Sequence, residues 1–135
     1  MNMTHTAAIA DSYQPSSAVH SEHYRNLSAA FDALGIGVSH FFGGGVYAKQ
    51  TVIPAGVELL QHSHAFDHLS ILATGSVVVR VNGESTPYVG PACIVIKAGI
   101  PHAVKATTNA VWYCIHATDE TEPEAADASL IEGVT

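Results

Sequence analysis

The sequence predicts an all-β protein, built as a sandwich or a barrel. Seven or eight short segments rich in Val and Ile follow one another between residues 46 and 116, separated by turn signals of glycine, proline and asparagine. Apolar residues make up 47% of the chain and charged residues only 13%, so much of the chain must be buried. A single domain fits the length of 135 residues, and it can bury a hydrophobic core without disulfides.

The chain before these strands has a different character. Residues 1–20 are polar and aperiodic, which predicts a flexible N-terminal arm. Residues 21–35 predict a short helix, with Ser21 at its N-cap and Gly35 at its C-terminal end. One apolar stripe on this helix would pack on the domain's own core or across a dimer. The stripe consists of Tyr24, Leu27, Phe31 and Leu34.

The expected strands are bounded by recognisable turns. Pro54-Ala55-Gly56 separates the first two strands, and Asn82-Gly83 is a strong signal for a two-residue hairpin turn. The helix and the strands together define one predicted domain, residues 21–117. We expect strands at residues 46–53, 57–64, 69–73, 77–81, 85–89, 93–97, 102–106 and 110–116.

The last segment of the chain, residues 118–135, is acidic. It holds six of the twelve acidic residues and no basic residue, which predicts a solvated C-terminal tail. An alternative is that Leu130, Ile131 and Val134 dock a short terminal element on the domain.

The charge pattern makes binding to nucleic acid or to an anionic membrane surface improbable. The net charge is −7, and the five basic residues are scattered singly without forming a patch. No stretch approaches the roughly 18 apolar residues of a membrane span, and no signal peptide is apparent, so we expect a cytoplasmic protein. In that compartment Cys93 and Cys114 should be reduced, and we expect them to be buried and inert.

Four of the nine histidines have the spacing of metal ligands. His62 and His64 lie two residues apart in an expected strand, so their side chains point the same way. His68 follows across a short break, and His102 begins a later strand. Neutral imidazole binds divalent metals through one ring nitrogen, and it suits Zn, Cu, Fe and Ni. The pattern therefore predicts a metal centre.

An all-imidazole centre has a distinct electrostatic character. Four neutral ligands leave the full charge of a divalent metal uncompensated, which favours an anionic co-ligand and makes the centre a strong Lewis acid. In octahedral coordination, two neighbouring positions remain open for a substrate, or for a substrate and dioxygen. A closed tetrahedral site would instead be structural zinc.

Strand alternation predicts which side chains surround the metal. Leu60 should share a face with the first two histidines, and Ser70 and Leu72 should share a face with His68. Phe66 lies in the break between ligands. These residues predict a mostly apolar pocket for a small hydrophobic or aromatic ligand.

Two further residues have open roles. Asp67 is either a hydrogen-bond acceptor for a metal ligand or part of a turn. His116 ends the last strand, where it is either on the surface or in contact with one of the metal-binding histidines.

The residues around the first three histidines resemble the first signature of the cupin superfamily. That signature reads Gly-x5-His-x-His-x3/4-Glu-x6-Gly. The chain fits it without gaps through Gly56, His62, His64, His68 and Gly75. In this match His68 takes the position of the usual glutamate.

The second cupin signature, Gly-x5-Pro-x-Gly-x2-His, is matched less closely. Gly90, Gly99 and His102 fit it with one extra residue between the two glycines, and Lys97 replaces the proline. The resemblance covers about residues 46–116.

The chain is similar to small single-domain cupins that carry four histidines. The resemblance implies a double-stranded β-helix of the jelly-roll type, a homodimer, and one metal ion in the mouth of the barrel. It implies iron or manganese as the metal, with zinc, nickel or copper as alternatives. The implied ligands are His62, His64, His68 and His102.

Three functions are compatible with such a site, because this fold hosts many activities. The leading hypothesis is a metal-dependent oxidoreductase of the dioxygenase type, acting on a small organic substrate. The alternative is a non-catalytic module that binds a small molecule or is stabilised by metal. A metal-assisted lyase or isomerase would need a general base, for which the chain offers Tyr113 or Glu58.

Overall fold

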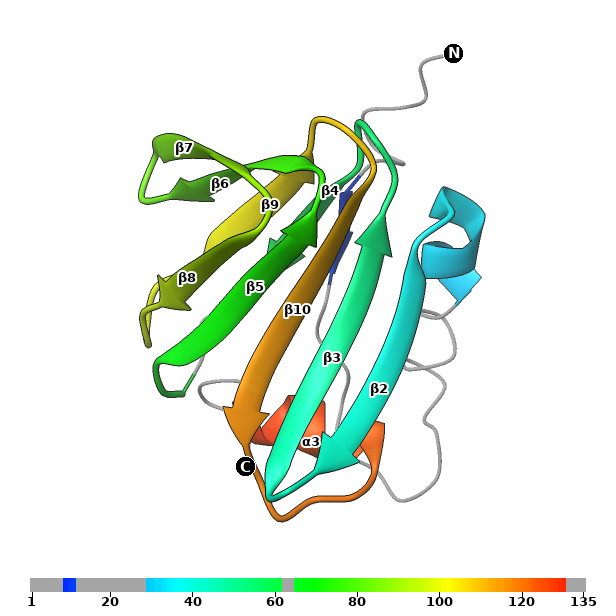
Figure 1. Cartoon of the computed structure of the whole chain (residues 1–135), viewed down its shortest axis with the longest axis vertical. Helices are drawn as coiled ribbons and strands as arrows, with labels where there is room; N and C mark the ends of the chain where they lie inside the picture. Colours follow the sequence, from blue (N-terminus) through cyan, green and yellow to red (C-terminus); the bar gives the residue numbers. More distant parts are fainter. Residues whose placement is uncertain (1–8, 12–28, 62–64, 131–135) are drawn as a thin grey trace.

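The computed structural model describes residues 9–11, 29–61 and 65–130. In these residues two five-stranded sheets enclose one core (Figure 1). Sheet A contains, in spatial order, β1 (Ile9–Asp11), β4 (Glu58–Gln61), β9 (His102–Ala106), β6 (Ser76–Val81) and β7 (Glu84–Val89). Sheet B contains, in spatial order, β2 (Gly37–Gly43), β3 (Val46–Ile53), β10 (Ala110–Ala117), β5 (His68–Thr74) and β8 (Ala92–Ile96).

The chain passes repeatedly from one sheet to the other. β3 and β4, β5 and β6, β7 and β8, and β9 and β10 are neighbours in sequence but lie in different sheets. All strand pairs are antiparallel except β1 with β4. This arrangement is a jelly-roll, or double-stranded β-helix, and it confirms the predicted fold class.

The core lies between the two sheets and is most apolar at one end of the strands. There the inner positions of β3, β5 and β10 carry Ile53, Leu72 and Trp112, each fully buried. From sheet A, Val77 and Val104 meet them, with exposed fractions of 1% and 0%. Alternation of inward and outward side chains along each strand therefore produces the barrel interior.

Residues 29–34 are helical, as predicted for the end of the segment 21–35. Phe31 is buried, Leu34 packs against the core, and Gly35 ends the helix with a φ of 76°. The rest of the predicted stripe, Tyr24 and Leu27, lies outside the described residues.

Two strands of the structure are not among the predicted ones. β2 is joined to β3 by Gly44-Gly45, whose φ angles of 61° and 77° suit a two-residue hairpin turn. β2 gave no strand signal because it is an edge strand whose residues are only partly buried. β1 lies within the segment expected to be a flexible arm, and it pairs in parallel with β4.

The C-terminal segment contains a helix, α3 (Pro123–Leu130). Glu124 is 1% exposed and Ala126 is fully buried, so the expectation of a solvated tail does not hold for residues 123–126. Pro123 sits at the first helical position, where its missing N–H costs no hydrogen bond. Neither helical segment of the described chain is long and apolar enough to cross a bilayer.

Candidate metal centre

The inner face of sheet B changes from apolar to polar toward one end of the barrel. Strand register arranges its inward side chains in rows that cross β8, β5, β10, β3 and β2. A row of Leu72, Trp112 and Thr51 is followed by a row of Ser70, Cys114, Lys49 and His40. The terminal row contains His68, which follows directly on the last β5–β10 pair, and then His116, Tyr47 and Phe42.

Two of the four predicted metal ligands face each other across this polar end. His68 begins β5 in sheet B, and His102 begins β9 in sheet A. Each side chain is 5% exposed. The two rings are close enough that His102 lowers the pKa of His68. The fold thus brings together residues that are 34 positions apart in the sequence.

The electrostatic state of both histidines suits metal binding. Burial lowers the pKa of His68 to about 4, and His102 and His116 add smaller effects in the same direction. Burial also lowers the pKa of His102 to about 4, against a smaller opposing effect from the backbone of Ile100. Both imidazoles are therefore neutral at physiological pH, which is the form that coordinates a metal. Ser70 Oγ lies 3.4 Å from Nε2 of His68 and can help to orient the ring.

The other two predicted ligands, His62 and His64, lie outside the described residues. Within residues 9–11, 29–61 and 65–130, no three side chains of His, Cys, Asp or Glu are grouped so that they could hold a metal ion. Gln61, which precedes His62 in the sequence, is the register partner of His102. The described structure therefore contains two of the four predicted ligands, and Gln61, the residue before a third, pairs with one of them.

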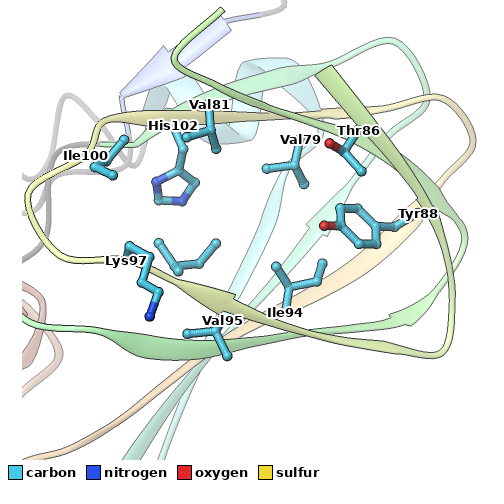
Figure 2. A pocket seen from close by; sticks show the side chains of 10 residues that line it. Val79, Val81, Thr86, Tyr88, Ile94, Val95, Lys97, Ile100 and His102 are labelled. Carbon is cyan, nitrogen blue, oxygen red and sulfur yellow. The ribbon is translucent and has the colours of Figure 1, made fainter. Parts of the chain in front are cut away.

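A pocket of about 140 Å³ opens beside His102 (Figure 2). It lies between β6 and β7 of sheet A and β8 of sheet B, and the rings of His102 and Tyr88 extend into it from opposite ends. Most of its wall is aliphatic, with two hydroxyl groups and one lysine. It is lined by Val79, Val81, Thr86, Tyr88, Ile94, Val95, Ile96, Lys97, Ile100 and His102.

The four pocket residues expected from the sequence lie elsewhere. Leu60 is 42% exposed and lies on the opposite face of β4 from Leu59, which is buried. Phe66 is 39% exposed, and Ser70 and Leu72 are fully buried inside the barrel, but none of the four lines the pocket. Ser70 and Leu72 nevertheless share the inward face of β5 with His68, as strand alternation predicted. The predicted face that Leu60 shares with His62 and His64 stays a prediction, because those two histidines lie outside the described residues.

Asp67 connects the two loops that precede the ligand strands. Its Oδ1 accepts a hydrogen bond from the backbone N–H of Ala98 at 2.8 Å, and its Oδ2 lies 3.5 Å from Nζ of Lys97. The backbone hydrogen bond is the main reason that the pKa of Asp67 is lowered. These contacts hold the loop before His68 against the loop before His102, which is a longer-range role than either of the two predicted for Asp67.

His116 is buried rather than on the surface, with an exposed fraction of 6%. Its ring makes edge contacts with Tyr47 and Phe66, at centroid distances of 5.3 and 5.7 Å. Burial lowers its pKa, against an opposing effect from the backbone of Ala126 in α3. His116 therefore belongs to the polar end of the barrel, beside His68.

Sequence reasoning missed a partly buried pair at the polar end of the barrel, His40 and Tyr47. His40 Nδ1 lies 2.7 Å from the Tyr47 hydroxyl, and the two rings stack. Lys49, in the same row as His40, is only 7% exposed. The signal available in the sequence was the alternation of Tyr47 and Lys49 with less polar residues in a predicted strand, which places both on one face.

We expect the metal-free protein to lose stability as the pH falls from about 6.5 toward 4. Burial and then the charge of Lys49 lower the pKa of His40 from 6.5 to about 4, so in this window the unfolded chain binds a proton that the folded chain does not. His40→Phe should reduce the slope of unfolding free energy against pH, removing about 2 kcal/mol between these limits once solvent screening is considered. Urea unfolding with a chelator present measures the slope, and an unchanged slope would contradict the assignment.

Comparison with known proteins finds similar structures but no match in sequence. No family model matches the chain, and no curated protein matches it. A cupin superfamily protein from Desulfitobacterium hafniense is similar in structure, with 14% identity and a TM-score of 0.55 over 62% of this chain and 78% of that one. A conserved protein of unknown function from Streptococcus pyogenes has 19% identity and a TM-score of 0.54, over 64% and 76% of the two chains.

An enzyme is also among the similar structures. Salicylate 1,2-dioxygenase from Pseudoaminobacter salicylatoxidans, as a G106A mutant, shares 18% identity and a TM-score of 0.54. The likeness covers 60% of this chain but only 26% of the dioxygenase chain. At these identities the comparisons establish the fold: the chain has the cupin fold, a jelly-roll barrel with two buried histidines at one end.

Proposed function

We propose that the chain binds one divalent transition metal through His62, His64, His68 and His102, and that it is a metal-dependent oxidoreductase of the dioxygenase type. Its substrate is a small organic molecule. One observation carries the proposal: two buried, neutral imidazoles from opposite sheets lie together beside an apolar pocket.

The imidazole donors of these residues fit iron, zinc, nickel or copper. The resemblance to four-histidine cupins favours iron or manganese among the possible metals. When bound, such a metal would supply Lewis-acid and redox chemistry. The chain itself keeps both described ligands neutral by burial, and Ser70 is placed to orient His68. The aliphatic side chains around His102 keep water away from the reacting centre.

The pocket supports a substrate with a single ring or a short branched chain. An engineered protein cavity of about 150 Å³ holds one benzene molecule, and the pocket here is of similar size, at about 140 Å³. The hydroxyl groups of Thr86 and Tyr88 can orient polar substituents. Lys97 lines the pocket with its side chain 68% exposed, so it can attract a substrate carboxylate as the molecule enters.

The structure does not favour the lyase or isomerase alternative, because neither general base suggested by the sequence, Tyr113 or Glu58, lines the pocket. Tyr113 lies on the outer side of sheet B, where its hydroxyl accepts a hydrogen bond from Gln50. Glu58 is paired with Arg80 at 2.8 Å, on the face of β4 away from the core. A dioxygenase reaction does not require a protein base in the pocket, so these positions favour the oxidoreductase.

Oxygen consumption by the metal-loaded protein tests this proposal. Salicylate and gentisate are suitable probes, because each has one ring and a carboxylate. We expect iron- or manganese-loaded protein to consume oxygen with a single-ring acid, and His102→Ala to abolish the consumption. Binding of such a molecule without oxygen uptake would support the non-catalytic alternative and contradict the proposed reaction.

Filling the pocket should weaken substrate binding without removing the metal. We expect Val81→Phe to raise KM at least about tenfold, because the added ring occupies space beside His102. The matched control is Val78→Phe on the same strand, since Val78 does not line the pocket. Steady-state kinetics and metal content together check the prediction, and equal KM values for the two variants would contradict it.

A further inference from the structure

Two hydroxyl groups of β7 face the pocket that His102 borders. Thr86 and Tyr88 lie two positions apart on this strand, so their side chains share one face. Their register partners on β6, Val79 and Val77, are both buried, which identifies that face as the inward one. Figure 2 shows the oxygen atoms of both hydroxyl groups directed into the pocket.

The two ends of the pocket differ in chemistry. In Figure 2 the side chains of His102 and Lys97 lie at one end. Thr86 and Tyr88 lie at the opposite end, which we call the hydroxyl end. Much of the remaining wall is aliphatic and buried, and it includes Val79, Ile94 and Ile96. One end therefore carries a cation and a proposed metal ligand, whereas the hydroxyl end carries only neutral hydrogen-bonding groups.

The hydroxyl end is prepared for a polar group of a ligand. Tyr88 is partly buried and packs against the apolar core, so its ring is held in place. Within the described part of the chain, neither the Tyr88 nor the Thr86 hydroxyl is hydrogen-bonded to another residue. A tyrosine hydroxyl in an apolar setting usually has a partner, because its lost hydrogen bonds to water must be replaced. A polar group of the ligand can be that partner.

We infer that the pocket selects a single six-membered ring with two polar substituents in para positions. An anionic substituent is directed to the His102 end, and an uncharged hydroxyl group is directed to Tyr88 and Thr86. The inference rests on the proposed function, because it takes the metal to lie beside His102. A volume of about 140 Å³ admits one ring, and only substituents on opposite sides of that ring reach both ends.

Charge distinguishes the hydroxyl group from a second carboxylate at the hydroxyl end. Among the described residues that line the pocket, only Lys97 is a cation, and it lies at the other end. A carboxylate placed among aliphatic side chains without a counter-charge is costly to desolvate. Tyr88 and Thr86 therefore act as specificity-determining residues, which favour a phenolic hydroxyl group over a carboxylate.

Calorimetric titration with four probes tests the inference. The probes are benzoate, 3-hydroxybenzoate, 4-hydroxybenzoate and terephthalate, which differ only in the group that faces the hydroxyl end. The full chain is loaded with zinc, which has no redox chemistry, so binding is measured without turnover. We expect 4-hydroxybenzoate to bind about tenfold more tightly than benzoate or 3-hydroxybenzoate, as one well-placed hydrogen bond provides. Terephthalate should bind more weakly than benzoate.

Three variants locate the preference within the pocket. Tyr88→Phe keeps the ring and removes the hydroxyl group, so it should reduce the preference for 4-hydroxybenzoate over benzoate to about twofold or less. Thr86→Val should reduce it to a smaller extent, because Thr86 is exposed to water. Tyr113→Phe is the matched control, since the Tyr113 hydroxyl contacts Gln50 on the outer side of sheet B. An unchanged affinity for benzoate shows that each variant is folded.

The outcomes separate this inference from the proposed reaction. Equal affinities for benzoate and the two hydroxybenzoates, or a preference that survives Tyr88→Phe, would overturn the inference. Failure of all four probes to bind at millimolar concentration would overturn it as well. If the binding preference is present but the iron- or manganese-loaded protein consumes no oxygen, the proposed reaction is contradicted and the inference stands.

Discussion

The variant His68→Ala is expected to lose most of its bound metal. His68 is 5% exposed, neutral and at the polar end of the barrel, so its removal takes away one of the four proposed ligands. We expect metal content after dialysis to fall below about a tenth of the wild-type value, because even the loss of an indirect contact to a ligand can cost 10–100-fold in affinity. Elemental analysis of folded protein measures the loss.

Two further variants separate coordination from packing at this position. His68→Glu restores the residue usual in the first cupin signature, so it should retain metal while its reactivity changes. His40→Ala removes a partly buried histidine, one row away from the terminal row, and should leave the metal content unchanged. Unchanged metal in His68→Ala would contradict the four-ligand assignment.

The variant Gly75→Ala should be the most destabilising of the single substitutions considered. Gly75 lies between β5 and β6, where the chain passes from sheet B to sheet A. Its φ is 90°, and an added Cβ would lie 2.2 Å from the carbonyl oxygen of Asn109 and 2.7 Å from Cα of Ala110. Backbone atoms cannot yield as a flexible side chain can, so we expect a loss of more than about 3 kcal/mol.

A second glycine provides the control for this experiment. Gly83 has a similar φ of 79°, but no atom lies within 4 Å of its added Cβ. Gly83→Ala should therefore lower the free energy of unfolding by only about 1 kcal/mol, because the only strain is that of a side chain at positive φ. Chemical denaturation of both variants checks the difference, and equal losses would show that the contact with Asn109 and Ala110 does not matter.

Most of the barrel could be predicted from the sequence because alternation and turn chemistry are local properties. The predicted strands 46–53 and 102–106 have the same bounds as β3 and β9, and Asn82-Gly83 forms the turn between β6 and β7. The remaining predicted strands that are fully described differ by only one or two residues at their ends. The sequence also indicated that His68 and His102 belong together, and the fold places them so.

The features that the sequence could not predict depend on contacts between segments that are far apart in the chain or on pairing with a neighbouring strand. β2 is identified as a strand only through its pairing with β3, and α3 is held by the burial of Glu124 and Ala126. The pocket was assigned to Leu60 and its neighbours by strand parity, but the actual lining comes from β6, β7 and β8. Those strands carry no metal-ligand motif, so nothing local marked them, and His102, which also lines the pocket, begins β9.

Elemental analysis of the wild-type chain, purified without an affinity tag, tests the metal centre most directly. Omitting the tag matters because additional histidines and nickel resin would introduce metal of their own. We predict about one equivalent of a divalent transition metal per chain, chiefly iron or manganese, which a chelator removes and which His68→Ala fails to retain. Folded wild-type protein that holds less than about a tenth of an equivalent, even after incubation with iron or manganese, would contradict the assignment.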